Sequence, residues 1–475
     1  MTPRRLWLAL CLTLTGVPGA PWAALAAAQT SGETPATEPA RPTGEAKPTA
    51  EPAPADEPGP SWWTDLGLRG ALIYKNFSHF HDSPAGDGQF RNEGIFRLEW
   101  QRRLAAWASV KAGVEARGDD GDFTDGVYFR IPETGRRRSI LNVREVVLRL
   151  RRDPVEVTLG KQVFAWGTGD AYNPTDLVNP YDALDPIDSE KMGVYSAAVR
   201  VTRGATSGVF VVVPAFTPTR EPLQPSRWTP TTGADGPVVV DDRQVPSVEL
   251  GHVQYAARVK TTLAGVDMSL SYFEGFERTP VLRLSSAVLA PGIEVPRVTP
   301  LYTRIRAPGA DFATTWGPFE FHGEAAARFV ASDGRDDRLQ AIVGASYTKD
   351  DFDLRWLRHL VVGVEYAREI VFRRRTPSPF FEPPVVPGLG EGVPFRDALI
   401  GKVAVKLTEE TSVKAAALVD LDQRANAFAQ LKVSHKVTDA LLLEGGVDLF
   451  IGRTDTIWGR WRDNDRFFAQ LQHLF

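Results

Sequence analysis

The sequence predicts an all-β fold, and three observations predict it. From Trp62 to the end of the 475-residue sequence, short segments alternate apolar and polar side chains, which is the period of a strand with two different faces. Tight polar connections between these segments alternate with long ones rich in Gly, Pro and Asp, as in strands joined in an up-and-down order. Helical periodicity is not sustained, and no apolar run beyond the N-terminal segment is long enough to cross a bilayer as a helix.

Residues 1–28 are typical of a secretory signal peptide. Arg4 and Arg5 precede an apolar segment, and small residues precede a cleavage point near Ala28. The alternative, a membrane anchor, is less favoured because the apolar segment is short and is broken by Gly16. The only cysteine, Cys11, lies in this segment, so the exported chain would offer neither a disulfide nor a thiolate metal site. We expect export, with no metal and no cofactor.

Residues 29–60 are rich in Pro, Ala, Thr and Glu and hold almost no large apolar side chain. Such a segment buries too little surface to offset its chain entropy, so we expect a disordered tether. It is either a solvated spacer or an arm that reaches a partner. The remaining residues, 61–475, form the β-rich domain.

Within that domain the alternation repeats in strand after strand. Phe96, Leu98 and Trp100 alternate with Arg97 and Glu99, and apolar and ionisable side chains alternate in the same way from 319 to 329. We count about 18 strands, within a range of roughly 16 to 18, and an even number brings both ends of a single-chain barrel to one side of a membrane. The expected fold is a transmembrane antiparallel up-and-down β-barrel. A soluble β-sandwich or propeller is the alternative, but no blade repeat is present.

The last ten residues, 466–475, support the barrel. Phe467, Ala469, Leu471 and Phe475 share one parity, while Gln470 and Gln472 share the other. This segment resembles the terminal strand of Gram-negative outer-membrane β-barrels, in which a C-terminal aromatic residue is the assembly signal. The resemblance implies that role for Phe475, a location in the cell outer membrane, and a periplasmic position for the tether.

Ionisable side chains of both signs occupy the parity that would face the lumen. A barrel of this size encloses more space than side chains fill, so we expect these groups to line water; alternatively, they pair with one another across neighbouring strands. The predicted pore-lining residues are Arg97, Glu99, Lys111, Glu145, Arg149, Arg200, Arg258, Glu320, His322, Glu324, Arg328, Glu365 and Lys402.

The segment 160–193 is the most unusual long connection. It contains repeated Asn-Pro and Asp-Pro steps, which force turns and predict a structured loop. On a wide barrel such a loop either folds inward as a constriction or forms an outer lid. Its carboxylates suggest Ca²⁺ as a further alternative, but the spacing of EF-hand ligands is absent. The candidate constriction residues are Lys161, Trp166, Asp170, Asp176, Asp182 and Lys191.

In length, strand pattern and ending, residues 62–475 resemble porin-like and alginate-export-like outer-membrane channels. The resemblance implies passage of small polar solutes through a water-filled lumen, with outer-membrane lipid and the barrel assembly machinery as partners. It also implies a homo-oligomer, for which the residues show no interface signature. The alternatives are an export conduit for a polysaccharide or lipid that works with periplasmic partners, and a plugged structural barrel. The net charge of −4 argues against a nucleic-acid partner. No nucleophile motif such as G-x-S-x-G accompanies the histidines, so we expect no enzyme activity.

Overall fold

The computed structural model describes residues 66–475, except for 84, 224, 230–238, 291, 332–333, 351, 353–356, 375–379, 382–394, 424, 455 and 457. The predicted signal peptide (1–28) and tether (29–60) lie outside the described residues.

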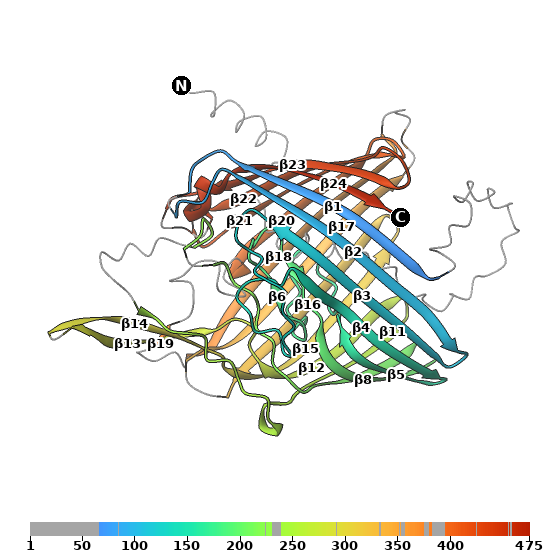
Figure 1. The fold of residues 1–475 in the computed structure, drawn as a ribbon. Helices are drawn as coiled ribbons and strands as arrows, with labels where there is room; N and C mark the ends of the chain where they lie inside the picture. The colour runs from blue at the N-terminus through green and yellow to red at the C-terminus, as the bar shows by residue number, and fades with distance from the viewer. Residues whose placement is uncertain are drawn as a thin grey trace, which may run out of the picture.

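Eighteen antiparallel strands form one closed barrel (Figure 1), which confirms the predicted fold class. Each strand pairs with the next barrel strand along the chain, and β24 pairs back to β1, so that no edge remains open. The barrel strands are β1 (Leu68–His79), β2 (Phe90–Ala105), β3 (Ala108–Asp119), β4 (Leu141–Arg152), β5 (Val155–Gln162), β8 (Val194–Arg203), β9 (Thr206–Val213), β11 (Gln254–Leu263), β12 (Val266–Phe276), β15 (Arg304–Trp316), β16 (Phe319–Val330), β17 (Asp337–Asp350), β18 (His359–Arg373), β20 (Asp397–Lys406), β21 (Thr411–Asp420), β22 (Ala427–Lys436), β23 (Leu441–Ile451) and β24 (Arg466–Leu474).

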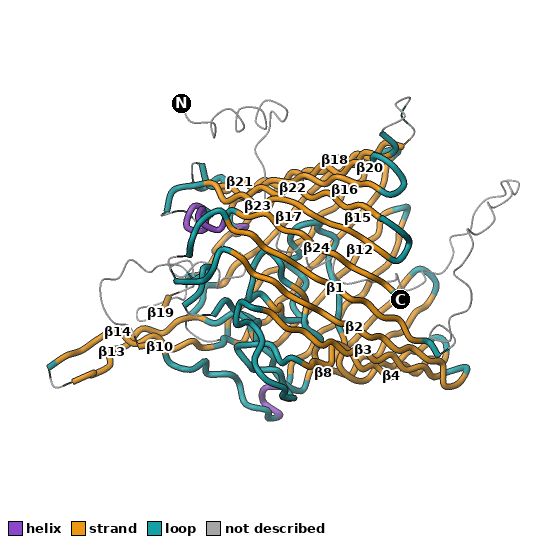
Figure 2. Tube along the Cα trace, turned by 45° about the horizontal axis from the view of Figure 1, so that its top comes forward, coloured by secondary structure: helices purple, strands orange, loops and turns teal. Residues whose placement is uncertain are grey.

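The two ends of the barrel differ in their connections. At one end the strands are joined by tight turns, such as residues 106–107 between β2 and β3. The first residues of β1 and the last residues of β24 lie at this same end. At the other end the connections are long, and they form most of the teal segments that Figure 2 shows beside the barrel wall. We call these the short-turn end and the long-connection end.

The side chains are distributed in the opposite sense to those of a soluble domain. On the outer face, Leu72, Leu270 and Val343 are 51%, 70% and 54% exposed. On the inner face, Glu93 and Arg117 are only 1% and 5% exposed. A soluble protein buries its apolar side chains and exposes its charges. A barrel in a bilayer needs an apolar outer surface, which contacts the lipid. It also needs a closed hydrogen-bonded sheet, because lipid offers no hydrogen-bond partner to the backbone.

One long connection contains strands that the sequence pattern did not reveal. In the connection between β12 and β15, where the sequence pattern indicates only a long link, β13 (Val281–Ala290) and β14 (Ile293–Leu301) form a hairpin. The hairpin projects away from the barrel (Figure 1) and belongs to a separate sheet with β10 (Val239–Val240) and β19 (Phe380–Phe381). Pro and Gly residues, which are common in loops, lie in and beside this hairpin, and they concealed the alternation of its strand residues.

The remaining short elements lie in the long connections. Residues 163–193, which join β5 to β8, are called the inner loop below; they include the paired two-residue strands β6 (Tyr181–Asp182) and β7 (Glu190–Lys191). Short 3-10 helices, η1 (Leu250–His252) and η4 (Gly459–Asn464), lie in other long connections. Within the described part of the chain, no helix combines the length and the apolar character needed to cross a membrane.

Candidate functional site

The inner loop lies inside the barrel and is bonded to the wall formed by β1, β2 and β24. Asp185 accepts hydrogen bonds from Arg91 Nη2 at 2.6 Å and from Arg466 Nη1 at 2.5 Å. Asp188 accepts one from Lys75 Nζ at 2.8 Å. Burial alone would raise the pKa of Asp185, but the guanidinium groups of Arg466 and Arg91 hold it below its ordinary value. Buried ion pairs therefore attach the loop to this wall.

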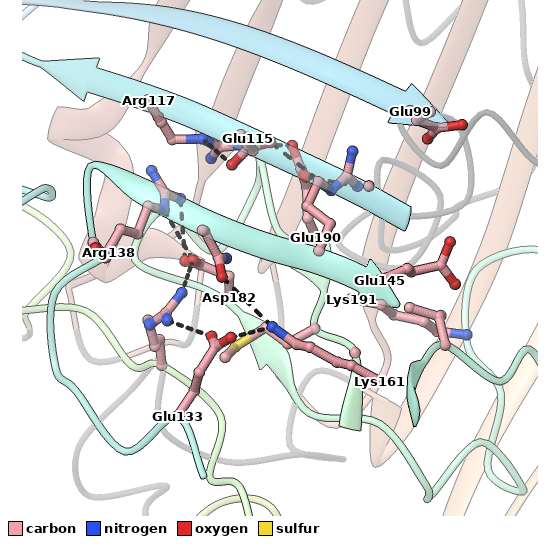
Figure 3. A pocket seen from close by; sticks show the side chains of 18 of the residues that line it. Glu99, Glu115, Arg117, Glu133, Arg138, Glu145, Lys161, Asp182, Glu190 and Lys191 are labelled. Atoms are coloured by element: carbon pink, nitrogen blue, oxygen red, sulfur yellow. Dashed lines mark hydrogen bonds and ion pairs between the residues drawn. The ribbon is translucent and has the colours of Figure 1, made fainter. Parts of the chain in front are cut away.

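A second group of ion pairs joins the loop to β2 and to the connection between β3 and β4. Glu190 accepts hydrogen bonds from Arg97 Nη2 at 2.7 and 2.8 Å. Asp182 accepts one from Arg138 Nε at 2.9 Å and one from Arg220 Nη1 at 2.6 Å. Figure 3 shows Glu190 and Asp182 beside arginines that converge from different segments. Charge-assisted contacts of this kind are the stronger class of hydrogen bond.

On the other side of the barrel, two carboxylates of the wall hold the backbone of the same loop. Glu324 of β16 accepts hydrogen bonds from the Thr168 N–H at 2.8 Å, the Thr175 N–H at 2.6 Å and the Thr175 hydroxyl at 2.8 Å. Glu365 of β18 accepts one from the Asp170 N–H at 2.6 Å. The inner loop is thus bonded to β1 and β24 at one side and to β16 and β18 at the other, and it crosses the lumen.

Apolar packing fixes the loop to the wall in the half of the barrel that faces the long-connection end. Leu184 and Ile187 of the loop are 0% and 3% exposed. They share a cluster with inward residues of six strands, namely Ile342, Ala367, Ile400, Ala416, Leu418, Phe428 and Phe450. A second cluster joins Trp166, Leu177 and Val178 of the loop to Val194, Ala198, Val211, Val213, Ala256, Phe273, Ile305, Ala307 and Val330. This half of the lumen is packed like a protein core.

Asn179 ties the two ends of the inner loop together. Its side-chain oxygen accepts the Phe164 N–H at 2.7 Å, and its amide nitrogen donates to the Met192 carbonyl at 2.7 Å and the Gln162 carbonyl at 3.2 Å. The residue is 1% exposed. One side chain therefore satisfies three backbone groups that lie away from water and that no strand pairing would satisfy.

Two cavities lie between the loop and the wall. One, of about 180 Å³, is lined mainly by charged side chains, among them Lys161, Glu133 and Arg138 (Figure 3). The other, of about 610 Å³, lies against β1, β2 and β21–β24, and its lining includes Arg69, Gln472 and Leu474 near the short-turn end. The interior thus keeps polar space on the short-turn side of the inner loop.

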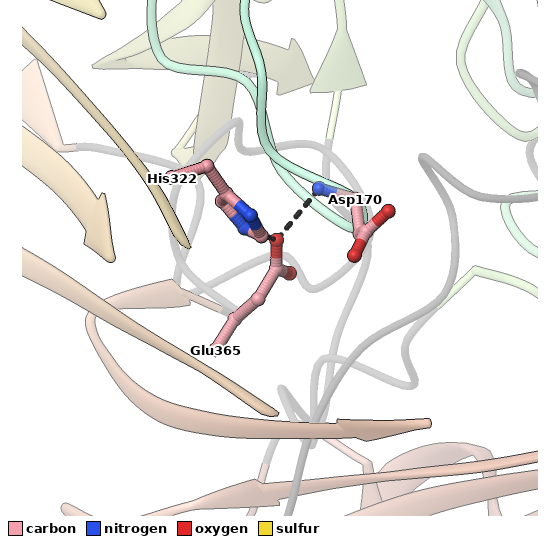
Figure 4. Close-up of side chains that lie close together, drawn as sticks. All are labelled: Asp170, His322 and Glu365. Atoms are coloured by element: carbon pink, nitrogen blue, oxygen red, sulfur yellow. Dashed lines mark hydrogen bonds and ion pairs between the residues drawn. The ribbon is translucent and has the colours of Figure 1, made fainter. Parts of the chain in front are cut away.

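Within the described part of the chain, Asp170, His322 and Glu365 bring metal-ligand atoms within 4.8 Å of one another (Figure 4). Other groups already use these atoms. Asp170 forms an ion pair with Lys402, and Glu365 is bonded to His322 Nε2 at 2.8 Å as well as to the loop backbone. A lysine ammonium beside the carboxylate competes with a cation, so the cluster fits a loop attachment better than a metal site. The carboxylates considered for Ca²⁺ are likewise bound to cations: Asp176 to Lys191, and Asp182 and Asp185 to arginines.

The predicted pore-lining residues lie on the inward parity of their strands, but the expectation that all of them line water is wrong. Arg97, His322, Glu324, Arg328 and Glu365 are buried. The reason is that the inner loop covers four of them and that Glu277, just beyond β12, pairs with Arg328 at 2.9 Å. The others are half-buried or exposed within the barrel, and several pair across strands, as Lys111 does with Glu145 at 2.6 Å. This remaining set comprises Glu99, Lys111, Glu145, Arg149, Arg200, Arg258, Glu320 and Lys402.

The candidate constriction residues lie inside the barrel, but they do not all narrow it. Trp166 is 6% exposed and packs into the wall cluster. Lys161 lies at the end of β5, outside the inner loop, and forms an ion pair with Glu133. Asp170, Asp176, Asp182 and Lys191 belong to the loop and face charged partners across it.

Sequence reasoning missed the strongest attachments of the loop. Arg91 and Arg466 are inward strand residues that meet at Asp185, and Arg466 also pairs with Asp448 at 2.7 Å. The sequence offered one signal for these attachments: each arginine is a charged residue at a position of β2 or β24 whose side chain faces the lumen.

No protein-family model matches the chain, and no curated protein matches it either. Solved structures with some similarity include a mutant of the Rh. blastica porin, with 12% sequence identity over 86% of this chain and 99% of that chain and a TM-score of 0.38. Another is Wzi of Escherichia coli, described as an outer-membrane protein involved in group 1 capsule assembly and a carbohydrate-binding β-barrel, with 12% identity over 86% and 84% and a TM-score of 0.47. OmpF of Salmonella typhi in complex with daunomycin has 8% identity over 86% and 97% and a TM-score of 0.38. Similarities at this level carry no functional information about this chain.

Proposed function

We propose that this protein is an outer-membrane channel that passes small polar solutes through a lumen narrowed by its own inner loop. The observation that carries the proposal is the double attachment of that loop, to Arg466 and Arg91 on one wall and to Glu324 on the other, above a polar cavity of about 610 Å³. A loop held at both sides of a barrel leaves a narrow passage in place of a wide one.

The location follows from the same architecture. A closed barrel with an apolar outer face and an even number of strands is the form in which sheets cross bacterial outer membranes. In such barrels the short turns face the periplasm, so the larger cavity would open toward the periplasm and the hairpin of β13 and β14 would stand outside the cell.

The main rival is an export conduit that opens only when it works with periplasmic partners. The specific observation in its favour is the apolar packing of Leu184, Ile187 and Trp166 into the wall. Such packing leaves little room for solutes on the long-connection side, and an exporter would have to displace the loop. The segment 29–60 is a candidate arm for those partners.

Conductance of the purified protein in planar lipid bilayers tests the proposal. We expect small, steady single-channel currents, because the inner loop occupies much of the lumen. The double variant Asp185→Ala with Glu324→Ala removes one attachment on each side of the loop and should raise the single-channel conductance at least about twofold, since the loop is then held only by its other ion pairs and its apolar contacts. Asp153→Ala, at an exposed turn residue paired with Arg151, is the matched control and should leave the current unchanged. A silent wild type that conducts only as the double variant would favour the gated exporter, and silence of both would exclude the channel.

A further inference from the structure

We propose that the inner wall carries an anion-binding subsite at Lys414, inside the larger cavity, and that the subsite takes a small solute bearing a carboxylate or phosphate group. The subsite rests on the proposed channel function and specifies the class of solute. It would lie on the short-turn side of the inner loop, where a solute would meet it before or after the constriction.

Lys414 stands in an unfavourable electrostatic position. It lies on β21 directly opposite Lys432 on β22, and like charges opposite one another destabilise a sheet. Lys402 on β20 lies opposite Ala416, two positions along β21 from Lys414. Lys432 is compensated by Glu444 at 2.8 Å, and Lys402 is compensated by Asp170. Among the described residues, Lys414 forms neither a hydrogen bond nor an ion pair.

The carboxylates nearest to Lys414 are engaged elsewhere. Glu444 accepts hydrogen bonds from Ser434 at 2.7 Å and from Gln470 at 3.2 Å, in addition to its ion pair with Lys432. Asp448 accepts from Gln430 at 2.7 Å and also pairs with a buried arginine of β24. These contacts hold both carboxylates in place, and the ammonium of Lys414 stays available to a ligand.

The other charges of the cavity wall compensate one another. Lys75 pairs with Asp188, Arg97 and Arg144 pair with Glu190, and Arg466 pairs with Asp448. Arg69 of β1 and Glu99 of β2 lie directly opposite each other. Lys414 is therefore the lining cation that, among the described residues, has neither an ion pair nor a carboxylate directly opposite it on a neighbouring strand.

The size of the cavity fits a small organic solute better than a bare ion. Pockets for small molecules commonly enclose about 300–1,000 Å³, and this one encloses about 610 Å³. The amides of Gln430, Gln470 and Gln472 line the same cavity and offer neutral hydrogen-bonding groups to the uncharged part of such a solute.

Equilibrium dialysis of the detergent-solubilised full barrel tests the subsite. The probes are radiolabelled inorganic phosphate, acetate and, as the neutral comparison, glucose, all at low ionic strength. We expect the wild type to retain phosphate or acetate above glucose, Lys414→Arg to keep that retention, and Lys414→Gln to weaken it at least about fivefold. Lys260→Gln is the matched control, because Lys260 is another lysine of the wall but pairs with Asp267 at 3.2 Å; it should bind as the wild type does. Preference for phosphate or for acetate identifies the anionic group.

Misfolding should not cause the loss of anion binding, because Lys414→Gln removes a like-charge contact. We expect the melting temperature of this variant to equal or exceed that of the wild type. Equal anion retention by the wild type and Lys414→Gln, or retention no greater than that of glucose, would overturn the subsite. Bilayer recordings separate this failure from failure of the channel. Anion binding without any current would refute the channel and keep the subsite. Current without anion binding, with the same anion-to-cation preference in the wild type and Lys414→Gln, would refute the subsite alone.

Discussion

Asp185 is the carboxylate at which two buried arginines of the wall, Arg91 and Arg466, meet. Arg466 and Asp185 are 1% and 0% exposed, and loss of Asp185 would leave Arg91 buried without its ion-pair partner and Arg466 with Asp448 alone. Breaking a buried pair in this way costs roughly 3–5 kcal/mol. We therefore expect Asp185→Ala to lower the free energy of unfolding by about that amount, measured by urea unfolding in detergent micelles. Asp153→Ala, whose ion pair is exposed, should cost less than about 1 kcal/mol; equal effects of the two substitutions would contradict the role of Asp185.

Glu221, in the long connection between β9 and β11, should make the stability depend on pH. Burial raises the pKa of this carboxyl to about 7, against the pull of Arg243 and Arg136. Because the folded protein holds a proton that the unfolded chain releases, stability falls as the pH rises from about 4.5 through 7.

The matching substitution is Glu221→Gln, which cannot ionise. It should raise the melting temperature, followed by circular dichroism, at pH 8, and the gain over the wild type should disappear near pH 4. A gain of the same size at both pH values would show that ionisation of Glu221 is not its cause.

At the scale of the element, the inner loop is a preformed structure whose closure depends on Asn179. Asn179→Asp keeps the oxygen that accepts the Phe164 N–H but loses the two donated hydrogen bonds, a loss worth about 1–3 kcal/mol for buried groups. We expect faster amide hydrogen exchange throughout the inner loop. The amides of the barrel strands serve as the internal reference and should not change; uniform acceleration in loop and strands would indicate general destabilisation.

The sequence predicts the strands far better than it predicts the contacts of this loop. Alternation places Arg97 and Glu324 on the inward face, because the strand period is local to a few residues. The bond between Arg466 and Asp185 joins positions 281 residues apart, and no periodicity in the loop encodes it. The Asn-Pro and Asp-Pro steps predict order in the loop, but its inward direction depends on apolar residues of strands that lie far along the chain. For the same reason, the burial of His322 and Glu365 could not be predicted from strand parity.

At the scale of the whole molecule, closure depends on the pairing of β1 with β24. Removal of residues 466–475 would leave the backbone groups of β1 and β23 unpaired in lipid, where each unpaired group costs several kcal/mol. We expect this truncated chain to fail to fold in detergent or lipid, as judged by loss of the heat-resistant compact band on gel electrophoresis. A stable folded band would contradict the need for closure by β24.

Phe475 provides a separate test, of assembly in the cell. Its backbone exchanges hydrogen bonds with Gly70 at 2.8 and 3.1 Å, and these bonds persist whatever the side chain. If the aromatic ring acts as a signal to the assembly machinery, as we propose, Phe475→Ala should refold in detergent like the wild type, yet its amount in the outer membrane should fall. A parallel loss in both settings would indicate a purely structural role.

The position of the inner loop in the chain determines the order of events during biogenesis. A ribosome makes residues 163–193 before β16, β18 and β24, which supply Glu324, Glu365 and Arg466 as their partners. The contact of Asp185 with Arg466 forms only when the terminal strand is in place. Closure of the wall and full attachment of the segment are therefore coupled.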